Sequence, residues 1–558
     1  MLKIHVVLAM VAAGAACGEE ATLSLGTEEA TAPLQEADAL AEGSLAALAT
    51  TAEAIRFLEQ ASFGPRPQTI NRVRTLGIPA FLDEQLAAPS GQYAPTPAHV
   101  PPTPCNAAFP ADTDLDAQFY VAAINGGDQL RQRVMFALSQ ILVISANGIN
   151  ENQNTCNSER RDAMQRYLNV LRRGAFGSYR ELLEAIALEP AMGNYLDMVN
   201  NVAFDRNGNK LDPNENFARE LMQLFTVGTN RLNEQGAVLL SNGEPIPVYD
   251  EVDVEEFSRA LTGWTYPHPD GCPTARGGKR PAAYNARMIG CAINHDSTSA
   301  RLLRYATASK TRTTGGASPR AHLEEVLDNL FQHPNLPPFV VKQLIHHLVT
   351  SNPSGAYVRR VVQVFKDDGA GNRGNLGAVV RAILLDPEAR TAGGATYGRL
   401  RAPAEFITRV VRSLGGTLDT TANDPGGALN TYGSRMGQDV PRPPSVFSYF
   451  QAQSQLVGPE FALLDSYTAT KRAEFVHQLA FGTSLANRGV SISLAMNEGT
   501  PQLLSWLDTN LLHGTMSPTL RSTLTGVLND GFFTSRPAQK RAMAVYLTSL
   551  SPEFQIQR

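Results

Sequence analysis

The chain has 558 residues, of which 43% are apolar and 18% are charged. This composition is typical of a globular protein with a large core and excludes an intrinsically disordered chain. The 48 basic and 53 acidic residues leave a net charge of −5. That balance excludes an overall basic nucleic-acid-binding protein, so no nucleic-acid partner is expected.

Residues 1–16 have the organisation of a bacterial lipoprotein signal peptide. Lys3 and His5 give a short polar start, the following apolar run is too short to cross a bilayer, and Gly14-Ala15-Ala16 precede Cys17. We therefore expect export, cleavage before Cys17 and attachment of a lipid to that cysteine. The protein would face the periplasm or lie on the outer membrane, bound to the membrane through its N-terminal lipid. Ordinary secretory cleavage, which produces a secreted protein, is the alternative.

Residues 17–50 differ in composition from the rest of the chain. Positions 18–50 hold seven acidic residues and no basic or aromatic one: Glu19, Glu20, Glu28, Glu29, Glu36, Asp38 and Glu42. Such a segment cannot bury a core, so 17–50 is predicted to be a disordered acidic tether. The negative charge of the chain lies in this tether, and residues 51–558 are close to neutral.

From residue 51 onward, apolar residues recur at helical spacing. In 130–144, for example, Val134, Leu138 and Ile141 share one stripe. The same pattern predicts helices over 78–86, 164–171, 179–187, 213–227, 254–261, 323–331, 339–349, 358–365, 376–385, 403–414, 462–481, 501–512, 518–528 and 537–550. Strand-like alternation is confined to a small hairpin around Asn242-Gly243. The predicted fold class is all-α, with many helices, minor β-hairpin content and long loops at 88–112, 265–320 and 415–445.

Four further cysteines would lie in an oxidising compartment after export: Cys105, Cys156, Cys272 and Cys291. Four cysteines allow three pairings. Cys272–Cys291 and Cys105–Cys156 are favoured, because each pair brackets an irregular segment that a disulfide would order. Free buried thiols are the alternative.

The segment 212–228, DPNENFARELMQLFTVG, has an informative polar pattern. Asp212 is placed to cap the helix predicted directly after it. At about 100° per residue, Asn216, Glu220 and Gln223 follow one edge of the apolar face. A carboxylate and two amides there are compatible with part of a metal or sugar site. A hydrogen-bonded polar seam against another helix is the alternative.

This segment and the following 255–264, EEFSRALTGW, resemble the bacterial family called domain of unknown function 1800. Further stretches agree with the motifs of that family: Ser62-Phe63-Gly64-Pro65, Ala191-Met192, Tyr195-Leu196-Asp197, His295-Asp296, His333-Pro334, Pro443-Pro444-Ser445-Val446-Phe447 and 551–558. The resemblance spans roughly 51–558, which implies one large helical domain. It also implies an exported protein, often encoded beside sulfatase-like proteins, and it supplies no reaction.

Two functions are open at this point. In the first, the chain is an envelope enzyme or ligand-binding protein with a pocket for a polar ligand, metal or sugar. Glu220 and Asp296 would be acid–base groups or ligands of a divalent metal, and His295 would be a proton shuttle. The candidate ligand-binding residues are Asp197, Asn214, Asn216 and Trp264, the last as a platform for a sugar. For Trp264 a core position is the alternative, and for His295 a local structural role.

In the second function, the chain is a non-catalytic envelope scaffold, or a partner of another exported protein such as a sulfatase-like one. This hypothesis explains the tether, the large helical body and the lack of a known catalytic signature. The sequence therefore leaves open whether the protein is an enzyme, and it leaves any cofactor unknown.

Overall fold

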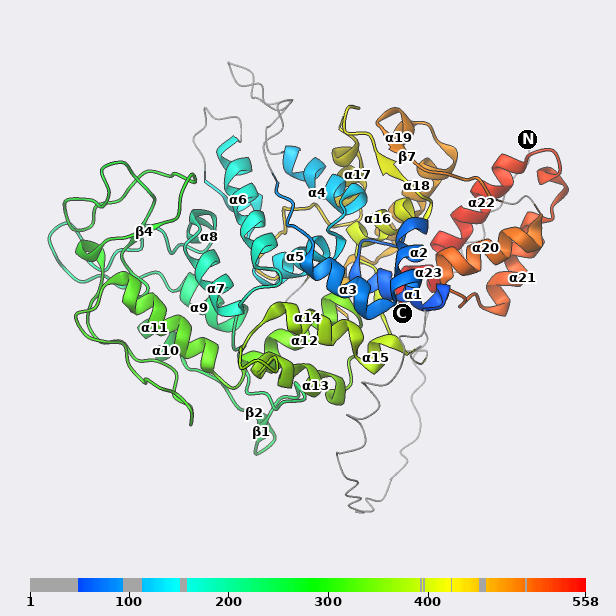
Figure 1. Cartoon of the computed structure of the whole chain (residues 1–558). Helices are drawn as coiled ribbons and strands as arrows, with labels where there is room; N and C mark the ends of the chain where they lie inside the picture. Colours follow the sequence, from blue (N-terminus) through cyan, green and yellow to red (C-terminus); the bar gives the residue numbers. More distant parts are fainter. Residues whose placement is uncertain are drawn as a thin grey trace, which may run out of the picture. The chain divides into compact units, whose positions relative to one another are not determined.

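The computed structural model describes residues 49–93, 113–150, 158–391, 394, 397–422, 424–450, 458–496 and 499–558. Within these residues α-helices dominate and the strands are short pairs (Figure 1), so the predicted all-α class is confirmed. Leu48–Arg558 gather into one compact unit. No helix in the described part of the chain is both long and apolar enough to cross a membrane.

A first hydrophobic core gathers most of the helices that precede residue 391. They are α1 (Thr51–Ala61), α2 (Pro67–Leu76), α3 (Ile78–Ala87), α5 (Gln129–Ile141), α6 (Ser158–Gly174), α7 (Tyr179–Ala187), α8 (Pro190–Tyr195), α9 (Asn216–Gln223), α10 (Glu251–Ala260), α11 (Pro319–Gln332), α12 (Leu336–Leu348), α13 (Gly355–Lys366), α14 (Leu376–Leu385) and α15 (Pro387–Arg390). Helix α12 lies against α5 and α13, and its Val341, Leu344 and Leu348 are fully buried. This core supports the loops that carry the predicted site residues.

A second hydrophobic core joins α4 (Thr113–Asn125) to the C-terminal helices. These are α16 (Pro403–Ser413), α17 (Pro425–Arg435), α18 (Ser466–Phe481), α19 (Ser484–Asn487), α20 (Thr500–Leu512), α21 (Pro518–Leu528), α22 (Pro537–Leu550) and α23 (Pro552–Gln555). Helix α4 lies against α17, and α18 lies against α22. Every residue of α16 is buried, including its charged ones. Helix α16 is therefore a central element of the C-terminal part.

The described strands pair two by two in antiparallel fashion. The pairs are β1 (Leu240–Ser241) with β2 (Glu244–Pro245), β3 (Trp264–Thr265) with β4 (Ile289–Gly290), β5 (Arg399–Leu400) with β8 (Ile556–Gln557), and β6 (Thr417–Leu418) with β7 (Val490–Ser491). The first pair is the hairpin predicted around Asn242-Gly243, whose φ angles of 53° and 86° suit a tight hairpin turn. The third pair sets Arg399 opposite Gln557 and so ties the C-terminus to α16.

The helix predicted over 213–227 is too long at both ends. Helix α9 begins only at Asn216, and no side chain of the residue before it caps the helix. Instead, the side chain of Asn214 accepts a hydrogen bond from the N–H of Asn216 at 2.9 Å, which holds the preceding turn outside the helix. The predicted cap by Asp212 is therefore wrong. At the other end, Thr226 donates to the carbonyl of Leu221 at 2.6 Å, and the chain leaves the helix in turns.

Candidate functional site

Three polar loops meet beside α9. The N–H of Asn200 donates to the carbonyl of Trp264 at 2.7 Å, and the N–H of Gly263 donates to the carbonyl of Asn201 at 2.9 Å. Asn201 also forms two hydrogen bonds with the main chain of Asn214, at 2.9 and 3.0 Å. The loop after α8, the loop before α9 and strand β3 are thereby joined. Three of the predicted site residues, Asp197, Asn214 and Trp264, lie on these segments, and Asn216 and Glu220 follow on α9.

The predicted ligand-binding residues Asp197, Asn214 and Asn216 are brought together. Asn216 donates a hydrogen bond to each of the other two. Its main-chain N–H donates to the side chain of Asn214 at 2.9 Å, and its Nδ2 donates to Asp197 at 3.3 Å. Asp197 and Asn214 are exposed, and Asp197 has a left-handed φ of 60°. The three residues form a polar strip at the start of α9. Their role in binding a ligand stays a prediction.

Trp264 is placed differently from these three residues. Its side chain is only 3% exposed and belongs to the first hydrophobic core. Strand β4 covers it, with Gly290 paired to Trp264. The geometry favours the core alternative, because a ligand cannot stack on a ring that the protein already covers.

Glu220 is the predicted site residue with an unpartnered carboxyl. The residue is 8% exposed, and its Oε2 is buried without a hydrogen bond to any residue that the structure describes. Burial raises the pKa of Glu220, against a smaller lowering by Arg219. The charge of Glu220 also acts on two partly buried tyrosines. Burial is the main cause that raises the pKa of Tyr195, and Glu220 adds to it. Burial is also the main cause that raises the pKa of Tyr249 to about 12. A buried carboxyl without a partner is costly and is typical of functional sites.

His295 is a link in a buried chain of two histidines. Its Nδ1 contacts the carbonyl of Thr262 at 2.9 Å, and its Nε2 lies 3.0 Å from Nδ1 of His322. The Nε2 of His322 in turn contacts the carbonyl of Thr314 at 2.8 Å. A carbonyl only accepts, so the two outer contacts each need an N–H on a histidine ring, and the contact between the rings needs a third proton. Two neutral rings carry only two such protons, so the fully bonded pair carries one positive charge. Burial lowers the pKa of His295 to about 4, so His295 itself is poorly suited to hold that charge.

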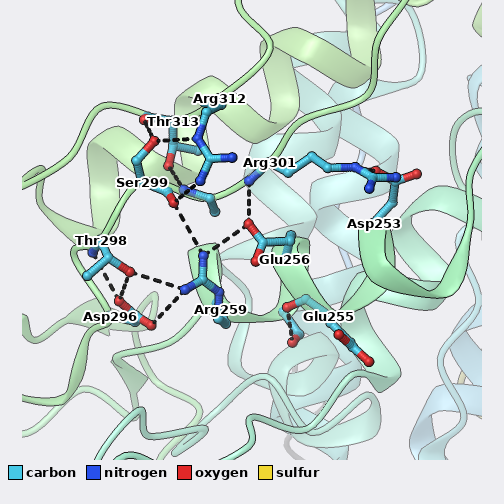
Figure 2. A network of polar contacts seen from close by, with 12 residues as sticks. Asp253, Glu255, Glu256, Arg259, Asp296, Thr298, Ser299, Arg301, Arg312 and Thr313 are labelled. Carbon is cyan, nitrogen blue, oxygen red and sulfur yellow. Dashed lines mark hydrogen bonds and ion pairs between the residues drawn. The ribbon is translucent and has the colours of Figure 1, made fainter.

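Asp296 is the end of an ion-pair network (Figure 2). Its Oδ2 lies 3.5 Å from Nη1 of Arg259, whose Nη2 binds Glu256 at 3.0 Å. The same Oδ2 lies 2.9 Å from the ammonium of Lys210. Thr298 donates to its other carboxylate oxygen at 2.5 Å. Burial opposes ionisation of Asp296, but the bonds from Thr298 and Lys210 outweigh it and lower its pKa. Asp296 is therefore held as an anion that joins the 295–299 loop to α10.

The three predicted catalytic side chains do not share a partner. The charge of Glu220 acts on the pKa of Tyr195 and of Tyr249, His295 contacts His322, and Asp296 pairs with Lys210 and Arg259. Over the described ranges, no three His, Cys, Asp or Glu side chains are grouped so that they could hold a metal ion. The catalytic assignment stays a prediction, and Glu220 is the member of the set whose carboxyl is left without a bond.

The structure joins Cys272 to Cys291 in a disulfide, the pairing that the sequence favoured. The loop between them includes Tyr284, whose hydroxyl donates to the carbonyl of Asn150 at 2.6 Å. The disulfide closes the 272–291 loop, and the bond from Tyr284 joins that loop to Asn150. Cys17, Cys105 and Cys156 lie outside the described residues.

Sequence reasoning missed a buried group of charged side chains, here called the arginine cluster. It consists of Arg133, Arg399, Arg401, Arg409, Arg412 and Arg472 with Glu59, Glu405 and Glu460. Its ion pairs are Arg401–Glu59 (3.0 Å), Arg409–Glu59 (2.7 Å), Arg133–Glu405 (2.7 Å), Arg399–Glu405 (2.5 Å) and Arg399–Glu460 (2.7 Å). Each of these nine residues is at most 6% exposed. The cluster connects α1, α5, α16 and the C-terminus.

The arginine cluster has a weak signal in the sequence. Arg401, Glu405 and Arg409 are four residues apart, a spacing that is usual for a solvated helix face. The residues between them are nearly all apolar, however, so α16 offers no polar face to solvent. Charged residues at helical spacing in an otherwise apolar helix could have indicated a buried charged stripe.

Two stretches that carry the family resemblance reach this cluster. The carbonyl of Gly64 accepts a hydrogen bond from Arg412 at 2.6 Å. Near the C-terminus, the carbonyl of Phe554 accepts one from Arg401 at 2.9 Å, and the side chain of Gln555 accepts one from Arg472 at 3.1 Å. Segments from opposite ends of the chain therefore meet at the buried arginines.

A search of curated proteins and a search of solved structures both returned no match. A family model does match, over residues 56–556, and its description is "Protein of unknown function (DUF1800)". The match covers nearly the whole helical body. The chain therefore belongs to the DUF1800 family, as its motifs predicted.

Proposed function

We propose that this chain is an exported, lipid-anchored protein that binds a hydroxyl-rich ligand of the sugar class at Glu220. The observation that carries the ligand site is the Glu220 carboxyl, which is 8% exposed and has a buried oxygen with no hydrogen bond within the described residues. The signal peptide, Cys17 and the acidic tether support the anchoring. Family membership adds no activity to this proposal.

The chemistry around Glu220 suits hydroxyl groups. An unpartnered carboxyl accepts hydrogen bonds when ionised and donates one when protonated, and burial raises the pKa of Glu220. Tyr195 and Tyr249 are partly buried tyrosines whose pKa values respond to the charge of Glu220, after burial as the main cause. Asn216, one turn earlier on α9, extends the polar surface. A carboxyl with amides and aromatic rings at its side is a combination that can bind sugar hydroxyls.

The test compares Glu220→Gln with Glu255→Gln, a matched change at an exposed glutamate on α10. Thermal unfolding is followed with a panel of neutral monosaccharides and, separately, with Mg²⁺, Ca²⁺ and Zn²⁺. We expect a sugar to raise the unfolding midpoint of the natural protein and of Glu255→Gln, but not of Glu220→Gln. A shift that only a metal produces, lost in Glu220→Gln, would replace the sugar by a metal. No shift with any compound would overturn the site.

The anchoring has its own test. Replacement Cys17→Ser removes the lipidated thiol, so the protein should leave the membrane fraction and lose incorporation of labelled fatty acid. Unchanged membrane association would contradict the anchor and leave the Glu220 site untouched.

A second candidate function is that of a partner for another exported protein, for which a sulfatase-like protein is our proposal. The observation in its favour is an exposed apolar run that leads into β1, with Val238, Leu239 and Leu240 at 43, 40 and 59% exposure. Replacement Leu240→Asp should abolish co-purification of such a partner, whereas Tyr467→Asp, at an equally exposed position on α18, should not. Equal recovery with both variants would exclude the hairpin as the contact.

A further inference from the structure

The arginine cluster contains more buried positive charge than its carboxylates balance. Six arginines, each at most 2% exposed, accompany three glutamates: the arginines are Arg133, Arg399, Arg401, Arg409, Arg412 and Arg472. Guanidinium groups do not give up their proton in proteins, so this excess is real charge. Buried charges are normally paired, because an uncompensated one is strongly destabilising.

Two of the six arginines, Arg412 and Arg472, form no ion pair with a carboxylate of the described residues and are bound by main-chain carbonyls instead. Arg412 donates to Gly64 and Ile124 at 2.6 and 2.5 Å, and Arg472 donates to the carbonyl of Arg401 at 2.8 Å. These bonds satisfy hydrogen-bonding groups but add no full negative charge. The ion-paired arginines also outnumber their carboxylates, four to three.

A small cavity lies inside this positive region. Its lining is Glu59, Ser62, Phe63, Gly64, Arg133, Arg401, Glu405, Arg409 and Gln557, all of them buried. The centre of a water-sized species can move within a volume of about 10 Å³, so the cavity holds one such species and no polyatomic anion.

Two arginines of the cavity lining each have a nitrogen without a hydrogen bond. The Nη1 atoms of Arg133 and Arg409 are buried and bond to no residue in the part of the chain that the structure describes. Nη2 of Arg133 binds the carbonyl of His347 at 2.6 Å, Nε of Arg409 binds Glu59 at 2.8 Å, and Nη2 of Arg409 binds the carbonyl of Leu511 at 3.2 Å. Each guanidinium is thus fixed in place with one free donor. Oε2 of Glu59 and Oε1 of Glu405, also from the lining, accept no hydrogen bond from the described residues, although they lie in ion pairs with Arg401 and Arg133.

We propose that the cavity is a site for a monoatomic anion of the size of chloride, bound by Nη1 of Arg133 and Nη1 of Arg409. A halide accepts both free N–H groups and supplies negative charge to a lining of three arginines and two glutamates. A water molecule would accept the same N–H groups without adding charge and would donate to Glu59 and Glu405. Burial, as the main cause, lowers the pKa of Arg133 and of Arg409 to about 10, which reflects the cost that an anion would offset.

The first experiment uses the whole protein as it exists. Thermal unfolding is measured in sodium chloride, sodium bromide and sodium gluconate at one ionic strength, because gluconate is too large for the cavity. We expect chloride and bromide to raise the midpoint by about 2 °C relative to gluconate. Crystals grown in bromide should show an anomalous peak between the two Nη1 atoms. Equal midpoints in the three salts, together with no bromide peak, would assign the cavity to water and overturn the proposal.

Variants sharpen the result. Arg133→Met removes one of the two free donors and should abolish the difference between chloride and gluconate. The control Arg381→Met breaks a surface pair with Asp83, at 3.0 Å, and should keep that difference. A halide effect that survives Arg133→Met would contradict this site. If Arg133→Met does not fold, the bromide peak in the natural protein decides the matter, since it needs no variant.

Discussion

Glu59 on α1 and Glu220 on α9 are two buried glutamates with opposite surroundings. Glu59, 2% exposed, has Arg409 at 2.7 Å, Arg401 at 3.0 Å and His513 at 3.3 Å. Burial opposes its ionisation, but the guanidinium groups of Arg401 and Arg409 outweigh burial and hold the pKa of Glu59 well below the ordinary value. Glu220, 8% exposed, has only the weaker influence of Arg219, so burial prevails and its pKa is raised.

The comparison shows that burial alone does not make a carboxyl structural or reactive. A buried carboxylate surrounded by cations is a fixed charge that holds helices together. A buried carboxyl without a partner destabilises the fold and has an accessible proton, which a binding or catalytic site can use. The first situation describes the arginine cluster, and the second describes the proposed ligand site.

The largest effect is expected from Glu59→Gln. The change leaves Arg401 and Arg409 without their shared carboxylate, so the free energy of unfolding should fall by about 3–5 kcal/mol. Denaturant unfolding measures it. The control Glu84→Gln breaks an exposed pair with Arg72 and should cost under about 1 kcal/mol. A loss of similar size in both variants would remove the distinction between the two glutamates.

A smaller loss of unfolding free energy is expected in mild acid. It comes from His295 and not from the ion pairs of Glu59. The pKa of His295 is about 4 in the folded chain and about 6.5 in the unfolded chain. Between these values the unfolded chain binds a proton that the folded chain does not, so the free energy of unfolding falls as pH drops through this window. The expected loss is about 1–3 kcal/mol for this residue. Glu59 stays ionised throughout the window, because its pKa is lowered.

Unfolding free energies at pH 7, 6 and 5 check this expectation. His295→Gln should reduce the pH dependence by the share of this one residue, because burial also lowers the pKa of His333 and of His346 to about 4 and these residues remain. His268→Gln, at a more exposed position, should leave the pH dependence as in the natural protein. An unchanged slope in His295→Gln would mean that His295 does not remain neutral in the fold.

The smallest effect is expected from Glu220→Gln, and its sign is opposite to that of Glu59→Gln. Removing an unpartnered buried acid should raise the free energy of unfolding at pH 7 by about 1 kcal/mol. In the natural protein the unfolded carboxyl loses its proton first, so stability falls as pH rises above about 4.5, and the variant should lack that fall. Glu255→Gln should be neutral. A clear loss of stability in Glu220→Gln would point to a structural role.

Helices were readily predicted because their signal is local. The stripe of Val134, Leu138 and Ile141 lies within α5, and the Asn242-Gly243 turn joins β1 to β2. The boundaries of α9 were missed, since the side chain of Asn214 competes with the expected cap at Asp212. Which polar residues would stay without a partner was not predictable, because partners come from distant segments.

The sequence by itself determined the helical class, the family motifs and the local polar edge that contains Glu220. These follow from spacing over a few residues, which the chain carries wherever it folds. Only the tertiary structure decided that α16 is buried with its arginines, that Trp264 lies in the core and that Glu59 gains partners from the far end of the chain. The physical reason is that burial and charge pairing depend on which segments pack together, and no local pattern states this.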